Sequence, residues 1–80
     1  MKKQQSVRRT PSLDDTYPAI SDWVMRSGWI ELGQTDYESS MVRVLDEGGM
    51  IWEGKHSYGS LDELFGVLEK KIAQHIQEIS

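Results

Sequence analysis

The hydrophobic period changes twice along this 80-residue chain, and that change limits the possible fold more than any other feature. Apolar residues recur at helical spacing over residues 18–27. Residues 29–34, 41–45 and 50–53 are instead rich in β-branched and aromatic side chains, and turn-rich stretches separate them. Helical spacing returns over residues 61–79. This order predicts a two-layer α+β fold, α-β-β-β-α, in which a three-stranded antiparallel meander carries two helices packed on one face.

The connection between the second and third strands predicts the register of the sheet. We expect residues 47–49 to form a three-residue loop with Gly49 in the left-handed conformation, which places Val44 opposite Trp52. The same register places Arg43 between Glu31 of the first strand and Glu53 of the third strand. The face toward the helices then comprises Ile30, Leu32, Val42, Val44, Met50 and Trp52.

The opposite face of the predicted sheet is the candidate binding site. It comprises Trp29, Glu31, Met41, Arg43, Leu45, Ile51 and Glu53. An arginine and an aromatic residue within an apolar patch are typical of protein interfaces. We therefore hypothesise that this face binds an unknown protein partner or a second copy of the chain, with Glu31 and Glu53 orienting Arg43. A solvated ladder of cross-strand charges, or a helix that crosses to this face, would give the same composition.

The last helix has the clearest start signal. Ser60 and Glu63 form a capping box, in which each side chain can accept a hydrogen bond from the other residue's backbone N–H. Asp62 and Glu63 also suit the positive end of the helix dipole. The apolar stripe that follows comprises Leu61, Leu64, Phe65, Leu68, Ile72, Ile76 and Ile79.

The N-terminus differs from the rest of the chain in charge and composition. Residues 1–15 are predicted to be a disordered tail, because they have too few large apolar side chains to offset the entropy of ordering. Its basic residues are Lys2, Lys3, Arg8 and Arg9, and no acid precedes residue 14. Residues 8–12 resemble a basic-directed phosphorylation site, with a solvated leader as the alternative. Residues 16–80 are predicted to form one domain.

Nucleic-acid binding is disfavoured by the charge of the body. Residues 14–80 contain 13 acidic and five basic side chains, a net charge of −8, which repels phosphate backbones. The predicted order of elements is that of double-stranded RNA-binding domains, but those place lysines where this chain has Asp62 and Glu63. A nucleic-acid binder would have to use the basic N-terminal tail.

Catalysis and metal binding also have little support in the sequence. No nucleophile elbow, phosphate loop, zinc helix or calcium loop is present, and the chain has no cysteine. A small enzyme would require His56 to meet Asp46, Glu47 or Tyr58 in a cleft. We therefore expect no enzymatic activity, no cofactor and no metal. The absence of a signal peptide and of a long apolar run predicts a cytoplasmic protein with no membrane association.

Four stretches of the chain resemble a family of small uncharacterised bacterial proteins, with cyanobacteria as the candidate group. They are YPxIxDWV at 17–24, where x is any residue, GWIELG at 28–33, RVLDEGGMIWEG at 43–54 and SLDE at 60–63. The resemblance covers about residues 17–75. It implies a compact bacterial domain and brings no catalytic residue, cofactor or partner.

Overall fold

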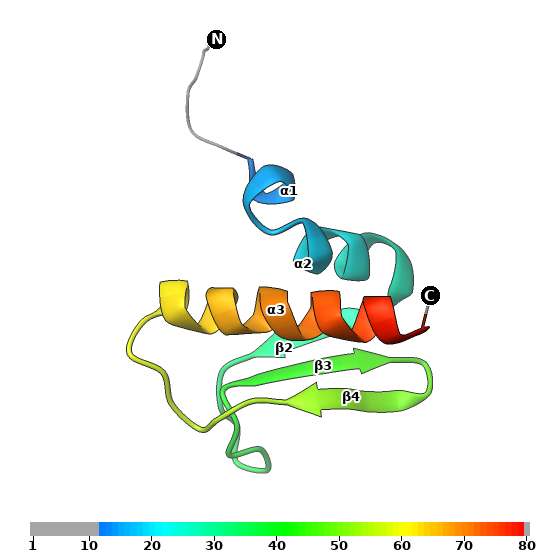
Figure 1. Ribbon diagram of the computed structural model, residues 1–80. Helices are drawn as coiled ribbons and strands as arrows, with labels where there is room; N and C mark the ends of the chain where they lie inside the picture. Colours follow the sequence, from blue (N-terminus) through cyan, green and yellow to red (C-terminus); the bar gives the residue numbers. More distant parts are fainter. Residues whose placement is uncertain (1–11, 80) are drawn as a thin grey trace, which may run out of the picture.

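The computed structural model describes residues 12–79 and confirms the α+β class. Its three strands form one antiparallel sheet in the order β2-β3-β4. All the helices lie on one side of this sheet, where α3 runs along it and α2 packs against α3 (Figure 1). The elements are α1 (Leu13–Thr16), α2 (Pro18–Asp22), the π-helical segment η1 (Trp23–Ser27), β2 (Trp29–Leu32), β3 (Val42–Asp46), β4 (Gly49–Glu53) and α3 (Leu61–Ile79).

The helical region before the sheet differs from the prediction at both ends. The helix α1 already spans Leu13–Thr16, ahead of the predicted start of structure near residue 16, and the Ser12 Oγ caps it by accepting a hydrogen bond from the Asp15 N–H at 3.1 Å. The rest of the predicted tail, residues 1–11, lies outside the described residues. The predicted helix over 18–27 is present but divides into α2 and η1. It ends where the Gly28 N–H donates to the Trp23 carbonyl at 2.9 Å, which closes a π turn.

The strand register follows the sequence pattern, but the turn does not. Val44 lies opposite Trp52 and Arg43 opposite Glu53, as predicted. On the other side of β3, Glu31 lies opposite Arg43. The predicted three-residue loop is wrong, because Asp46 pairs with Gly49 and the turn has only two residues between them. A β-bulge in β4 restores the predicted register beyond it.

The core lies between the inner face of the sheet and the helices. Its fully buried large side chains are Trp23, Val42, Val44, Leu64, Leu68 and Ile72. Trp23 also donates its indole N–H to the Leu45 carbonyl at 3.1 Å, which joins η1 to the sheet. Gly28 makes the close approach of these two segments possible, since a Cβ there would collide with the Leu45 carbonyl oxygen. Leu32, expected on the core face, is instead exposed near the end of the edge strand.

Two helix starts are capped by side chains, α3 locally by a hydroxyl and α2 through a tertiary contact by a carboxylate. The Glu63 N–H donates to the Ser60 Oγ at 3.1 Å, as the capping box predicts. The Glu63 carboxylate accepts from the Gly59 N–H at 2.7 Å and not from Ser60. Glu69 of α3 accepts from the backbone N–H groups of Ala19 and Ile20 at 2.8 and 2.9 Å, and so caps the start of α2 from another helix.

Candidate functional site

The β-bulge rearranges the face predicted to bind a partner. Residues paired across an antiparallel sheet share a face, so the pairing of Leu45 with Met50 places Met50 on the outer face, away from the helices. Ile51, predicted there, packs against the core. The bulge inserts one extra residue, which exchanges the faces of Met50 and Ile51. Met41 also packs against the core, so the predicted outer positions of Met41 and Ile51 are wrong.

Arg43 lies on the outer face but is buried, with 3% of its surface exposed. The β2–β3 connection (residues 33–41) surrounds its guanidinium. The Nη1 atom donates to the Ser40 carbonyl at 2.7 Å and to the Ser40 Oγ at 3.1 Å. The Nη2 atom donates to the Gly33 carbonyl at 2.8 Å. Arg43 therefore holds the connection in place, and its buried side chain leaves almost no surface for the direct partner contact predicted for it.

Glu31 is the carboxylate that pairs with Arg43. The Arg43 Nε donates to the Glu31 Oε1 at 3.0 Å, and the Trp29 indole N–H donates to the other carboxylate oxygen at 3.3 Å. These two hydrogen bonds, that from Arg43 first, lower the pKa of the Glu31 carboxyl below its usual value of 4.5. Glu38 lies at 3.8 Å from the Arg43 Nε. Glu53 lies opposite Arg43 in the register, but the second ion pair of Arg43 among the described residues is with Glu38.

The part of the outer face still open to a partner is therefore small. Trp29 is 44% exposed and Met50 is 48% exposed, with the half-buried Leu45 between them in the register. The sequence pattern predicts Trp29 and Leu45 on this face, as observed, but not Met50, because the bulge has no clear signal in the sequence.

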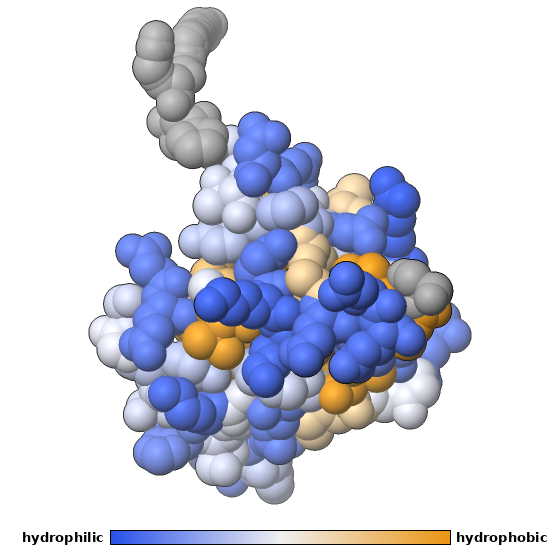
Figure 2. Space-filling model, viewed as in Figure 1, coloured by the Kyte–Doolittle hydropathy of each residue, from blue (hydrophilic) through white to orange (hydrophobic). Residues whose placement is uncertain are grey.

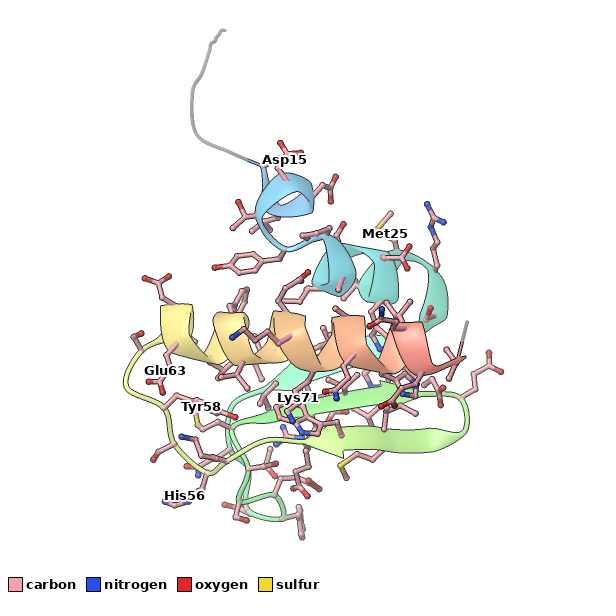
Figure 3. All side chains as sticks on the ribbon, in the orientation of Figure 1. Asp15, Met25, His56, Tyr58, Glu63 and Lys71 are labelled. Atoms are coloured by element: carbon pink, nitrogen blue, oxygen red, sulfur yellow. The ribbon has the colours of Figure 1, made fainter. Side chains whose placement is uncertain are left out.

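The residues that an enzyme at His56 would require do not come together in a cleft among residues 12–79. The His56 side chain is exposed and points away from the fold (Figure 3). The Asp46 carboxylate accepts from the Gly48 N–H at 2.8 Å, and the Tyr58 hydroxyl accepts from the Lys55 N–H at 3.0 Å. In the same range, no cluster of three or more His, Asp or Glu side chains could hold a metal ion. No helix of this range is long and apolar enough to cross a membrane.

A second candidate site, which sequence analysis missed, lies among the helices. We call it the helical hollow: an open space of about 220 Å³ lined by Leu13, Asp14, Tyr17, Ile20, Ser21, Val24, Met25 and Phe65. Of these, Leu13 is 68%, Val24 50% and Met25 77% exposed. Apolar side chains emerge between α3 and the helices above it in Figure 2, and Met25 points away from the sheet in Figure 3.

Three features of the fold create the helical hollow. The Tyr17 and Phe65 rings meet edge to face, with centroids 5.4 Å apart, and join α3 to the link between α1 and α2. The Glu69 cap holds the start of α2 against α3. The π turn of η1 then presents Val24 and Met25 to solvent while Trp23 stays in the core. π turns are uncommon and occur frequently at functional sites.

The rim of the helical hollow is acidic. Asp14 lines the hollow and also a shallower depression beside it, which Asp22 and Arg26 line as well. Arg26 is paired with Asp22 at 3.2 Å. Asp14 and Asp15 form the first turn of α1, and both are exposed. Asp14 also accepts a hydrogen bond from the Ser21 hydroxyl. The region therefore carries more negative than positive charge.

One sequence signal could have revealed the helical hollow. Trp23, Val24 and Met25 are three consecutive large apolar residues in a helical segment. Successive helical residues are about 100° apart, so the three span about 200° and cannot all face one core. At least one of the three must therefore face away from the core, and in the structure both Val24 and Met25 are exposed.

The comparisons with known proteins add no assignment. No protein-family model, no curated protein and no solved structure matches the chain. The basic residues of the predicted tail lie outside the described residues, so the nucleic-acid alternative stays a prediction.

Proposed function

We propose that the protein is a small protein-binding module that uses the helical hollow to hold one large apolar side chain of a partner protein. The observation that carries this proposal is the exposure of Leu13, Val24 and Met25 around a single concave space. Exposed apolar side chains gathered around a concavity are typical of interaction sites. Met25 adds adaptability, because an unbranched thioether can repack against different ligands.

The size of the hollow suggests what enters it. An apolar cavity of about 150 Å³ is large enough for benzene, so about 220 Å³ suits one aromatic or branched aliphatic side chain. One anchor in a pocket is also the usual source of binding energy at a protein interface.

The charge of the rim suggests what lies beside the anchor. Asp14 at the hollow and Asp22 in the neighbouring depression attract lysine or arginine, whereas two copies of this acidic rim would repel each other. The proposed ligand is therefore a protein segment that carries one large apolar side chain next to basic residues.

A synthetic peptide tests this proposal directly. The probe is a nine-residue peptide with four lysines around one central leucine, titrated while the Met25 methyl signal is followed by NMR. We expect a dissociation constant on the order of 1 mM. Burial of the leucine contributes about 1.5–3 kcal/mol, and each exposed charge contact adds less than about 1 kcal/mol.

Two matched variants serve as controls for the peptide experiment. Val24→Lys places a charge in the hollow and is expected to weaken binding about tenfold or more, which corresponds to about 1.4 kcal/mol. Met50→Lys makes the same change of charge on the other side of the molecule and is expected to leave binding unchanged. A peptide with glycine in place of leucine that shifts Met25 equally would contradict the proposal.

Self-association through the outer sheet face is a second candidate function. The exposure of Trp29 and Met50 on the side of the sheet that the helices leave open favours it. Light scattering across a concentration series tests this candidate. We expect the chain to dimerise with increasing concentration and Trp29→Ala to shift the midpoint upward, and a wild-type chain that stays monomeric throughout would refute it.

A further inference from the structure

We infer that the chain's own N-terminal segment, residues 2–9, is a ligand of the helical hollow and competes there with partner proteins. This inference rests on the proposed function, because it assigns a second occupant to the same site. The segment belongs to the proposed ligand class: Val7 is its large apolar side chain, and Arg8 and Arg9 follow it directly.

Charge complementarity is the first argument for this occupant. The segment contains four basic and no acidic side chains, whereas residues 14–80 have a net charge of −8. Asp14 carries part of that negative charge to the rim of the hollow, and Asp15 is the next residue in the same helical turn. Opposite charges on two parts of one chain favour their contact, most strongly at low ionic strength.

The position of the segment is the second argument. The described chain begins at Ser12, and Leu13, the next residue, already lines the hollow. Val7 is five residues before Ser12, a stretch of chain that can span up to about 17 Å. The segment can therefore turn back to the hollow without any change in the helices.

The size of Val7 indicates a reversible contact. Valine is smaller than the leucine or aromatic side chains that a space of about 220 Å³ can hold. A partner with a larger anchor fills the hollow better and can displace the segment. A short tether gives an effective concentration in the millimolar range, so at lower protein concentrations the segment of the same chain outcompetes that of a second copy.

A spin label on the segment tests its location. The chain has no cysteine, so Ser6→Cys gives a unique attachment site for a nitroxide in the full-length protein. The nitroxide broadens NMR signals that lie near it. Two methionine methyl groups report its position: Met25 lines the hollow, and Met50 lies on the opposite side of the molecule. Both are accessible to solvent, so they form a matched pair.

The expected result is stronger broadening of Met25 than of Met50. The double variant Arg8→Glu/Arg9→Glu should remove that difference, as should high salt. The variant Lys70→Glu/Lys71→Glu makes the same change of charge on the exposed side of α3 and should preserve the difference.

Equal broadening of the two methyl groups in the otherwise unaltered chain would overturn the inference. So would selective broadening in a mixture of spin-labelled chains with separate methyl-labelled chains, because the segment would then come from a second copy.

The lysine–leucine peptide separates this inference from the proposed function. With an effective concentration and a dissociation constant both of about 1 mM, the segment occupies about half of the hollows, and Arg8→Glu/Arg9→Glu should tighten peptide binding about twofold. Peptide binding without selective broadening of Met25 overturns only the role of the segment. If Met25 is broadened selectively but the Arg8→Glu/Arg9→Glu variant binds no peptide, the contact of the segment with the hollow is supported. The partner-binding function is then overturned.

Discussion

Replacement of Glu69 tests whether a carboxylate on α3 holds the N-terminal helices in place. Glu69→Ala removes two hydrogen bonds, at 2.8 and 2.9 Å, from the N–H groups of Ala19 and Ile20. α2 has no side-chain cap of its own at Tyr17, so nothing local replaces the lost acceptor. Each hydrogen bond to a charged group contributes about 1.5–3 kcal/mol. Glu69 is only half-buried, and water can partly replace it. We therefore expect a loss of about 2 kcal/mol, within the usual range for a helix cap.

Urea and thermal unfolding, followed by circular dichroism and tryptophan fluorescence, measure this loss. A loss of about 2 kcal/mol lowers the melting temperature by about 8–16 °C in a domain of this size. It is also a large part of the roughly 3–9 kcal/mol expected for the total stability.

Two variants make the interpretation of this loss specific. Glu78→Ala removes an exposed carboxylate from the same helix and should change stability by less than about 0.5 kcal/mol. Glu69→Gln retains one acceptor oxygen and should have an intermediate effect. The proposed role of the Glu69 cap is refuted if Glu69→Ala has the same unfolding midpoint as the wild-type chain or if Glu69→Gln is as stable as the wild type.

Three further predictions concern the sheet. Arg43→Met should lower the free energy of unfolding by about 2–4 kcal/mol and raise amide hydrogen exchange in residues 33–41, because the carbonyl groups of Gly33 and Ser40 lose a buried donor. Exchange at the wild-type rate would contradict the role of Arg43 in holding this connection. Since Arg43 lowers the pKa of Glu31 in the folded chain, that stabilisation is present above the unfolded pKa of about 4.5 and is lost as the pH falls through the lower folded pKa. Glu31→Gln should therefore be less stable at pH 7, and its stability should fall less on acidification, as urea midpoints between pH 7 and pH 3 will show. Gly28→Ala should cost about 2 kcal/mol or more in thermal unfolding, because its Cβ would meet the Leu45 carbonyl oxygen; a chain of normal stability would show that the two segments can separate.

The elements that the sequence predicts well depend on local pattern. The β runs alternate with period two, and this places Val44 and Trp52 on one face of the sheet and Glu31 and Arg43 on the other. The helix from Leu61 begins with a capping box whose serine half forms as expected. Each of these signals involves residues close in sequence or one repeated period, so no tertiary information is required to predict it.

Other features depend on contacts between distant segments, and the sequence pattern does not contain them. A three-residue loop without a bulge, as predicted, and a two-residue turn at 47–48 with a bulge at Ile51, as observed, give the same pairing beyond the bulge. The two arrangements differ in the faces of Met50 and Ile51. Arg43 is a surface residue by its position in the strand, and it becomes buried only because residues 33–41 fold over it.

The sequence by itself thus determines the α+β class, the faces of most strand residues and the start of the last helix, because local periodicity and capping specify all three. Only the tertiary structure decides where apolar surface stays exposed, because exposure depends on which segments pack together. The Glu69 cap and the π turn leave Val24 and Met25 beside Leu13, and this moves the candidate site from the sheet face to the helical hollow.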